Sequence, residues 1–431
     1  MTWKSGAGAT PRGYKFSYDR LGRLTDAEYG EGPSLSVNTN RFNEQVTGYD
    51  KMGNILGLKR YGQTSATGYD VIDDLSLSYA GNRLKKVADR SGTSAFNNGF
   101  EFKDGVDLST EYEYDENGNL TKDLNKNITA IQYNCLNLPS RVMFANGNSI
   151  SYLYDAAGRK LRTVHVLEGD SVTTDYCGNV VYENGVPQIL LTEVGYVSLT
   201  DGKYHYYLKD HQGNNRVVVD EEGTVEEVNH YYPFGGVFSS TGDAQPYKYN
   251  GKELDRKGGL DWYDYGARMY DAVLGRWHAV DPMSEKYYGV SPYLYCANNP
   301  ILLVDPNGMW PTWRGIRNGL NNALNTTLSF TNGAVRAVTD NILLGSTSLR
   351  ETGIYSSAGA YNVGQDVGDV ISLFIGGAEV IRGSGEVAAG LLGSPETGGV
   401  SLAVSTKGVV DVTHGSLMAT SGAMKLFSRK G

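Results

Sequence analysis

The sequence predicts a mainly β protein, in which a long, curled antiparallel sheet of short hairpins precedes a mostly α-helical carboxy-terminal tail. Three observations predict this fold class. The 431 residues include 31 Tyr and 55 Gly, residue types that favour half-buried strands and tight turns with positive φ. A short Tyr-Asp motif recurs along the chain. Only Tyr355 and Tyr361 lie beyond residue 309, so the composition changes near that point.

The recurring motif is Tyr-Asp-x-x-Gly-Arg/Asn-Leu, and each copy predicts one hairpin. The first strand ends at Tyr, Asp caps the turn backbone, Gly takes the left-handed position, and the second strand restarts at Leu or Ile. A lone hairpin is marginal in water, so successive hairpins must pair edge to edge and bury one face. Clear copies begin at Tyr18, Tyr49, Tyr114 and Tyr154, and weaker copies at Tyr79 and Tyr133.

Charge and composition exclude several classes of function. The net charge of -9 and the pI near 5.3 disfavour nucleic acid as a partner. Cys135, Cys177 and Cys296 show no paired spacing, so we expect three small buried side chains and neither disulfides nor zinc. The six histidines show no metal-ligand spacing, and no phosphate-binding loop is present, so no metal or cofactor is predicted.

The segment upstream of the composition change carries further motifs. They are Tyr207-Leu208-Lys209-Asp210-His211-Gln212-Gly213-Asn214, Tyr231-Tyr232-Pro233-Phe234-Gly235, Tyr249-Asn250-Gly251-Lys252-Glu253, Gly266-Ala267-Arg268-Met269-Tyr270-Asp271, Leu274-Gly275-Arg276-Trp277, Asp281-Pro282 and Asp305-Pro306-Asn307-Gly308-Met309. With the repeats, they resemble the YD-repeat or RHS (rearrangement hotspot) family and its repeat-associated core region.

That resemblance implies a domain organisation. Family members coil their repeats into a hollow β-shell around a toxic carboxy-terminal domain, and the core region plugs one end. By this resemblance, residues 1–200 are repeat hairpins of a partial shell, 201–309 are the core plug, and 310–431 are a Gly/Ala-rich, helical pre-toxin-like tail. Full-length members carry many more repeats than this chain.

The resemblance also implies a catalytic site. Family members cut themselves after the Asp-Pro-x-Gly-(Leu/Met) motif with two aspartates and an arginine, which places Arg268, Asp281 and Asp305 at the Met309–Trp310 bond. Two close carboxylates do not both ionise easily, so together they supply an acid and a base. The implied activity is a single cleavage in cis, without activity on other chains. The alternative is that Asp-Pro-x-Gly is only a turn, and Ala272 departs from the proline usual in the family.

The tail is expected to begin with an amphipathic helix, since one face gathers Trp313, Ile316, Leu320, Leu324 and Leu328. No metal cluster or basic cleft is visible in the tail. We therefore expect either that the effector tip is missing or that the tail is itself the cargo of the shell. A tail that perturbs membranes is a further alternative.

Two other readings of the whole chain stay open: a non-catalytic surface protein that binds glycans or proteins, and an inert remnant without a toxin tip. The resemblance implies a bacterial protein that is cytoplasmic before delivery and then secreted or on the cell surface. The sequence shows no signal peptide. Implied partners are a further repeat-bearing chain, secretion machinery and an immunity protein.

Overall fold

A computed structural model describes residues 1–5 and 9–309 of the chain. The predicted helical tail and Trp310 therefore lie outside the described residues. The described part is almost entirely antiparallel β-structure, in three sheets. The first sheet has seven strands in sequence order: β1 (Thr2–Trp3), β2 (Arg12–Tyr18), β3 (Leu24–Glu31), β4 (Glu44–Tyr49), β5 (Ile55–Gln63), β6 (Tyr69–Ala80) and β7 (Arg83–Asp89).

The second sheet has fourteen strands, again in sequence order. They are β8 (Tyr112–Tyr114), β9 (Leu120–Asp123), β10 (Ile128–Tyr133), β11 (Pro139–Phe144), β12 (Ser149–Tyr154), β13 (Lys160–Leu167), β14 (Asp170–Cys177), β15 (Val180–Glu183), β16 (Val186–Leu191), β17 (Gly195–Ser198), β18 (Tyr204–Lys209), β19 (Asn215–Asp220), β20 (Val225–Tyr231) and β21 (Val237–Thr241). Strands β18–β21 thus extend this sheet into the predicted core region.

A third, four-stranded sheet follows, together with short 3-10 turns. Its strands are β22 (Glu253–Asp255), β23 (Trp262–Asp264), β24 (Met269–Asp271) and β25 (Arg276–Trp277). The 3-10 turns of the described chain are η1 (Phe96–Asn98), η2 (Tyr249–Gly251), η3 (Lys257–Gly259), η4 (Ser284–Lys286) and η5 (Cys296–Asn298). We call the first two sheets together the belt and β22–β25 the inner sheet.

The structure confirms the predicted hairpins, and the copy that begins at Tyr49 shows how the motif works. Asp50 Oδ1 accepts the backbone N–H groups of Met52 and Asn54, both at 2.8 Å. Gly53 donates its N–H to the Asp50 carbonyl (3.1 Å) and has a φ of +86°, which glycine adopts without strain. Asn54 Nδ2 returns to Asp50 Oδ2 at 2.8 Å. The aspartate therefore accepts hydrogen bonds from the turn backbone. The side chain at the Arg/Asn position of the motif donates to the same aspartate and fixes its orientation.

The tyrosine of a repeat also fastens its hairpin to the one before it. A buried phenol needs a hydrogen-bond partner, and the carbonyl at the end of the preceding motif provides one. In three copies this bond links Tyr49 to Leu24 (2.5 Å), Tyr79 to Ile55 (2.7 Å) and Tyr133 to Leu120 (2.7 Å). The spacing of the motif thus sets both the turn and the contact between neighbouring hairpins.

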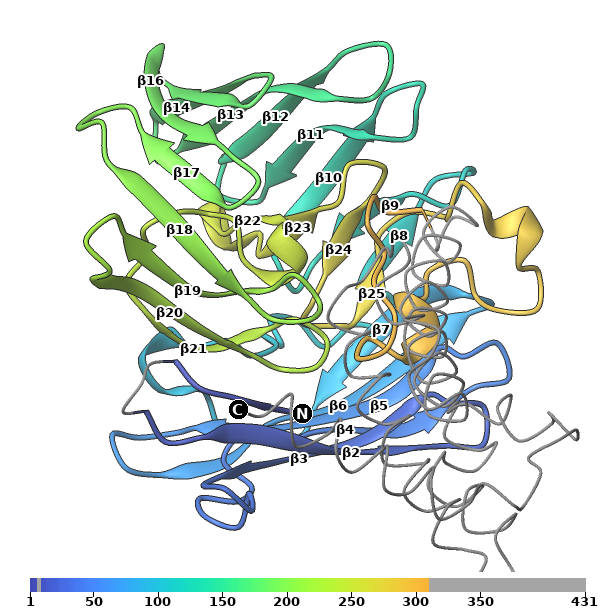
Figure 1. Ribbon diagram of the computed structural model, residues 1–431. Coiled ribbons are helices and arrows are strands. Elements are labelled where there is room, and N and C mark those ends of the chain that lie inside the picture. Colours follow the sequence, from blue (N-terminus) through green and yellow to red (C-terminus); the bar gives the residue numbers. More distant parts are fainter. Residues whose placement is uncertain (6–8, 310–431) are drawn as a thin grey trace, which may run out of the picture. The chain divides into compact units, whose positions relative to one another are not determined.

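The belt curves around the inner sheet (Figure 1). The second sheet follows the first at β7 and β8, where Glu111 N–H donates to the Lys85 carbonyl at 2.9 Å. The curve brings β20 back to β1, where Trp3 Nε1 donates to His230 Nδ1 at 3.0 Å. Residues more than two hundred positions apart therefore lie side by side.

The core lies between the belt and the inner sheet. In four copies of the motif the Leu or Ile at its end points inward, and these residues, Leu24, Ile55, Leu84 and Leu120, are all buried. They share one hydrophobic cluster with large aromatic side chains of the inner sheet and its loops, namely Trp262, Tyr263, Tyr265, Tyr270, Trp277 and Tyr295. Burial of these rings stabilises the curve, since large aromatic side chains dominate core energetics.

The expectation of three buried cysteines was wrong for two of them. Cys135 and Cys177 are exposed, and only Cys296 is buried. Cys135 follows Asn134, which caps the turn in its copy of the motif, and so it occupies a turn position that faces solvent. Within the described residues, no helix has the length and apolar character needed to span a bilayer.

Candidate functional site

The last turn of the described chain is Asp305–Met309, and its geometry follows from its sequence. Asp305 Oδ1 accepts the backbone N–H groups of Asn307 (3.3 Å) and Gly308 (2.9 Å). Gly308 has a φ of +75°, and a Cβ at this position would lie 2.9 Å from the backbone nitrogen of Arg268. Glycine is therefore required here both for its backbone conformation and for the close approach of Arg268.

This terminal turn packs against a second turn, Asp264–Arg268, which joins β23 to β24. Ala267 donates its backbone N–H to the Asn307 carbonyl at 3.1 Å. The next carbonyl, that of Gly308, accepts a hydrogen bond from Arg268 Nε. Two successive carbonyls of the terminal turn are thus held by two successive residues of the other turn.

The guanidinium of Arg268 lies at the centre of the site and is almost fully buried, with 2% of the residue exposed. Its Nη2 lies 2.8 Å from Asp281 Oδ2 and 3.3 Å from Asp305 Oδ2. Its Nη1 donates to the Pro292 carbonyl at 3.1 Å. The guanidinium carbon lies 4.2 Å from the centre of the Trp277 ring, a favourable cation–π distance. One arginine therefore joins two carboxylates, two carbonyls and an aromatic face.

Asp281 is held by its own turn. Its Oδ1 accepts the backbone N–H of Met283 at 2.7 Å, and its N–H donates to the Pro292 carbonyl at 3.1 Å. Only 4% of the residue is exposed. The Asp-Pro pair at 281–282 thus forms a local turn, as predicted, and also presents a carboxylate to Arg268.

Burial controls the electrostatics of the cluster. It raises the pKa of Asp305 above its ordinary value, and the neighbouring Arg268 opposes that shift. Burial likewise lowers the pKa of Arg268, against the opposing pull of Asp281 and Asp305. Burial also raises the pKa of the Cys296 thiol, and Asp305 adds to that shift. The site therefore favours a proton on Asp305 while it keeps a cation beside it.

The structure brings the predicted residues Arg268, Asp281 and Asp305 together. Met309 is partly exposed, and its N–H donates to Asn307 Oδ1 at 3.3 Å. Trp310, the other side of the predicted cleavage site, lies outside the described residues.

Two contributors to the site were not predicted. The Trp277 ring lies on the guanidinium of Arg268, and the Pro292 carbonyl accepts hydrogen bonds from both Arg268 and Asp281. The Leu-Gly-Arg-Trp motif was a signal for Trp277, since it lies among the other core motifs. A backbone carbonyl such as that of Pro292 leaves no signal in residue type.

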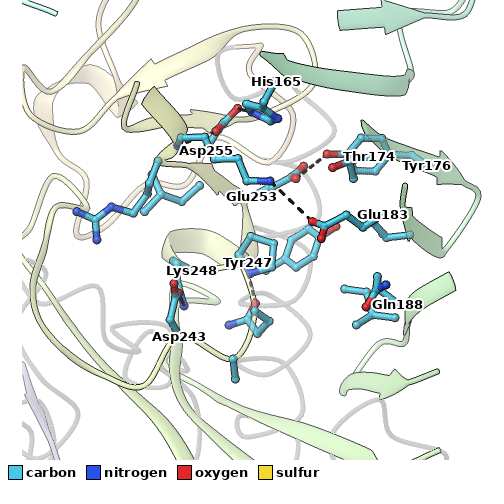
Figure 2. A pocket seen from close by; sticks show the side chains of 18 residues that line it. His165, Thr174, Tyr176, Glu183, Gln188, Asp243, Tyr247, Lys248, Glu253 and Asp255 are labelled. Carbon is cyan, nitrogen blue, oxygen red and sulfur yellow. Dashed lines mark hydrogen bonds and ion pairs between the residues drawn. The ribbon is translucent and has the colours of Figure 1, made fainter. Parts of the chain in front are cut away.

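A separate cavity of about 420 Å³ lies between β13–β16 of the belt and the segment 243–257 (Figure 2). Its lining mixes polar and apolar side chains, and each of its carboxylates lies beside a basic side chain. The pairs are Glu183 with Lys257, Asp243 with Lys248, Glu253 with Lys160, and Asp255 with His165. Two of these cations are shared, since Lys160 also contacts Asp264 and Lys248 also contacts Glu227.

Within residues 1–5 and 9–309, no group of three or more His, Cys, Asp or Glu side chains is arranged to hold a metal ion.

Fold and site together define a class: an antiparallel β-repeat belt around a small inner sheet, with a buried Arg-Asp-Asp cluster at the terminal turn. Three relatives are similar in sequence. Salivary gland surface protein 1 of Aedes aegypti is 31% identical over 223 residues, 45% of this chain and 6% of that protein. Toxin subunit YenC1 of Yersinia entomophaga is 29% identical over 219 residues, 48% of this chain and 20% of that protein. The tRNA3(Ser)-specific nuclease WapA of Bacillus spizizenii is 24% identical over 313 residues, 69% of this chain and 11% of that protein.

The chain thus spans a fifth or less of the length of each of these relatives. Its likeness to solved structures is distant. A crystal structure of TcdB2-TccC3-Cdc42 is 18% identical, with a TM-score of 0.39 over 72% of this chain and 19% of that one. The Photorhabdus luminescens Tc holotoxin pore is 18% identical, with a TM-score of 0.38 over 70% of this chain and 18% of that one. No family model matches the sequence.

Proposed function

We propose that this chain is the carboxy-terminal part of an RHS/YD-repeat shell that encloses a toxin, and that it cleaves its own Met309–Trp310 bond to release residues 310–431. The observation that carries the proposal is the convergence of Arg268 with Asp281 and Asp305, 13 and 37 positions away in the sequence. The Tyr-Asp hairpins and the similarity to toxin subunits of Yersinia entomophaga support the shell role.

In the proposed reaction, a water molecule adds to the Met309 carbonyl carbon and Asp281 accepts a proton from it. Asp281 takes the role of the base because it lies closer to the Arg268 guanidinium than Asp305 does. Asp305, which burial favours in its neutral form, donates its proton to the Trp310 nitrogen, and the C–N bond breaks. The products are a Met309 carboxylate and a new amino terminus at Trp310. The geometry acts on one bond of its own chain, so the reaction has a single turnover.

The mass of the purified protein tests this function. We expect the wild type to yield a fragment that runs from Trp310 to Gly431, while Asp281→Asn and Asp305→Asn leave the chain intact. Asp155→Asn is the matched control, because Asn134 fills the same capping position in its own copy of the motif. This control should be cleaved like the wild type. A wild-type chain of full mass would refute the catalytic part of the proposal.

The proposal extends to partners and location. The tail from residue 310 is the cargo. Further repeats come from more of the same polypeptide or from a partner protein. The protein is made in a bacterial cytoplasm and is delivered afterwards. An immunity protein accompanies the chain only if the tail is toxic. Separate expression of the two parts tests whether the tail is toxic. Growth of cells that make residues 310–431 alone should be impaired relative to cells that make residues 1–309.

A second candidate function is binding at a cell surface, to a glycan or a protein. The similarity to a salivary gland surface protein over 223 residues favours it. A glycan array with the Asp305→Asn chain distinguishes the two candidates, since a specific signal from an uncleaved chain supports surface binding. An array without signal, together with an intact wild-type mass, would leave the inert remnant as the reading.

A further inference from the structure

We infer that Lys252 is a positioning residue of the terminal site: its ammonium holds the Pro306 carbonyl and thereby keeps the bond after Met309 beside the two carboxyl groups. This inference rests on the proposed self-cleavage. It starts from one contact, the 2.6 Å hydrogen bond from Lys252 Nζ to the carbonyl oxygen of Pro306.

Three donors from two separate segments hold three successive carbonyls of the terminal turn. The Asn307 carbonyl accepts the N–H of Ala267, and the Gly308 carbonyl accepts Arg268 Nε, both from the turn between β23 and β24. The remaining carbonyl, that of Pro306, accepts the Lys252 ammonium. Lys252 thus fixes the first half of the turn from a segment that the other two donors do not share.

The backbone that carries Lys252 is itself well held. Its N–H donates to the Tyr249 carbonyl at 2.9 Å, and its carbonyl accepts the N–H of Lys248 at 2.8 Å. Its ammonium lies 5.2 Å from the centre of the Tyr265 ring, whose hydroxyl donates to Asn250 Oδ1 at 2.7 Å. A long, flexible side chain thus starts from a fixed base and passes over a fixed ring, which limits the positions of its end.

The position of this carbonyl matters for the chemistry because the terminal turn is short. Pro306 follows Asp305 directly and lies three residues before Met309, so a shift of its carbonyl moves both the acid and the bond to be cut. A misplacement of about 1 Å costs on the order of 100-fold in rate in enzymes. We therefore expect a loss of about 10- to 100-fold in the cleavage rate when the Lys252 ammonium is removed.

Lys252 has a second effect, through its charge. The charged and titratable groups that face Asp305 are Arg268, Asp281, the Cys296 thiol and Lys252. Removing the Lys252 cation leaves the pKa of Asp305, already raised by burial, higher still. Because the proposed acid is neutral Asp305, the rate falls as the pH rises through that pKa. The falling limb should therefore move to higher pH without Lys252.

The experiment follows cleavage of the full chain directly after cell-free synthesis. Synthesis is stopped, samples are transferred to buffers from about pH 5 to 9, and the fragment that begins at Trp310 is quantified by mass spectrometry over time. The variants are Lys252→Met, which removes the cation and the donor, Lys252→Gln, which keeps only a donor, and Lys252→Arg, which keeps both. Lys209→Met is the matched control, because that exposed lysine also lies over a tyrosine ring, 5.4 Å from the centre of Tyr207.

We expect Lys252→Met to cleave slowly, and its cleavage rate to fall at a higher pH than that of the wild type. Lys252→Arg should regain most of the wild-type rate. Lys209→Met should match the wild type in both rate and pH dependence. Lys252→Gln should regain part of the rate but keep the displaced limb. Cleavage by Lys252→Met at the wild-type rate overturns the inference and leaves the proposed function standing. Equal slowing by all three variants with an unmoved limb overturns it too, since that pattern indicates a general structural defect. A wild type without fragment overturns both proposals.

Discussion

Two regions of the described chain contain a buried arginine between two buried acids, yet we propose chemistry for one of them alone. We call them the belt cluster, Arg60 with Glu44 and Asp73, and the terminal cluster, Arg268 with Asp281 and Asp305. In both, the guanidinium also donates to backbone carbonyls, and backbone N–H groups bind the acids. Their composition is therefore nearly the same.

The belt cluster is built across three paired strands. Arg60 on β5 stands opposite Glu44 on β4 and opposite Asp73 on β6. Its Nη2 also donates to the Val273 carbonyl, in the turn between β24 and β25 of the inner sheet, at 2.6 Å. Burial raises the pKa of Asp73 to about 6, against the pull of Arg60. Regular pairing on both sides fixes the three side chains, and the cluster joins belt to inner sheet.

The terminal cluster is built from turns. Asp281 and Asp305 each lie in a turn rather than on a strand, and the chain continues from Asp305 through Met309 beside Arg268. An arginine and two acids are therefore not sufficient to define a catalytic site. The same three groups stabilise a fold when strands surround them, and they become candidates for catalysis when a turn outside the strands packs against them.

The largest loss of stability is expected when either arginine is removed. Arg60→Met and Arg268→Met each leave two buried carboxylates without their cation, so each should lower the free energy of unfolding by about 3–5 kcal/mol. Urea unfolding in an Asp305→Asn background measures the loss from Arg60→Met without interference from cleavage. In that background Arg268→Met leaves Asp281 as the one carboxylate of the terminal cluster without its cation, so its loss should lie at the low end of this range. In the otherwise wild-type chain, only Arg268→Met should also abolish the fragment. A folded Arg60→Met chain that fails to cleave would remove the distinction between the clusters.

A smaller effect is expected from two glycines with the same backbone conformation. Gly22 in a belt turn and Gly308 in the terminal turn both have a φ of +75°, but only Gly308 has another residue's backbone within reach of a Cβ. Gly22→Ala should cost about 1 kcal/mol for the left-handed backbone. Gly308→Ala should cost about 1–3 kcal/mol more, because its Cβ meets the Arg268 nitrogen. Equal thermal shifts for the two variants would contradict the packing described for the terminal turn.

The smallest effect concerns the tyrosine hydroxyls of the belt. Tyr79 donates to the Ile55 carbonyl, whereas the buried hydroxyl of Tyr154 has no hydrogen-bond partner among the described residues. Tyr79→Phe should therefore cost about 1 kcal/mol, and Tyr154→Phe should be neutral or slightly stabilising. Thermal melting of the two variants measures the difference. A larger loss from Tyr154→Phe would show that its hydroxyl is satisfied in solution.

Much of the belt could be predicted because its signals are local. The Tyr-Asp motif contains the strand end, the cap, the left-handed glycine and the next inward residue within seven positions, as in Tyr49 to Ile55. The three predicted site residues came instead from the resemblance of their motifs to the YD-repeat or RHS family, and two of them, Asp281 and Asp305, also cap turns formed by their own segments. Such turns are specified by the residues that form them.

The remaining features depend on long-range contacts. The bond from Trp3 to His230 spans 227 positions, and that from Lys252 to Pro306 spans 54. No residue-type pattern at one end of such a contact specifies the other end. The role of the Pro292 carbonyl could not be predicted either, since every residue has a backbone carbonyl. The exposure of Cys135 could have been predicted from its turn position, which is a stronger signal than the general tendency of cysteine to be buried.

The tyrosine bonds between hairpins also bear on how the molecule is made. Each of these bonds points backwards along the chain, from a tyrosine to the end of the preceding motif. A hairpin that leaves the ribosome thus finds its acceptor in a neighbour already synthesised, so we expect the belt to grow in the direction of translation. The terminal cluster needs Asp305, the last of its groups to be synthesised. The order of synthesis would then delay the proposed cleavage until the belt has folded.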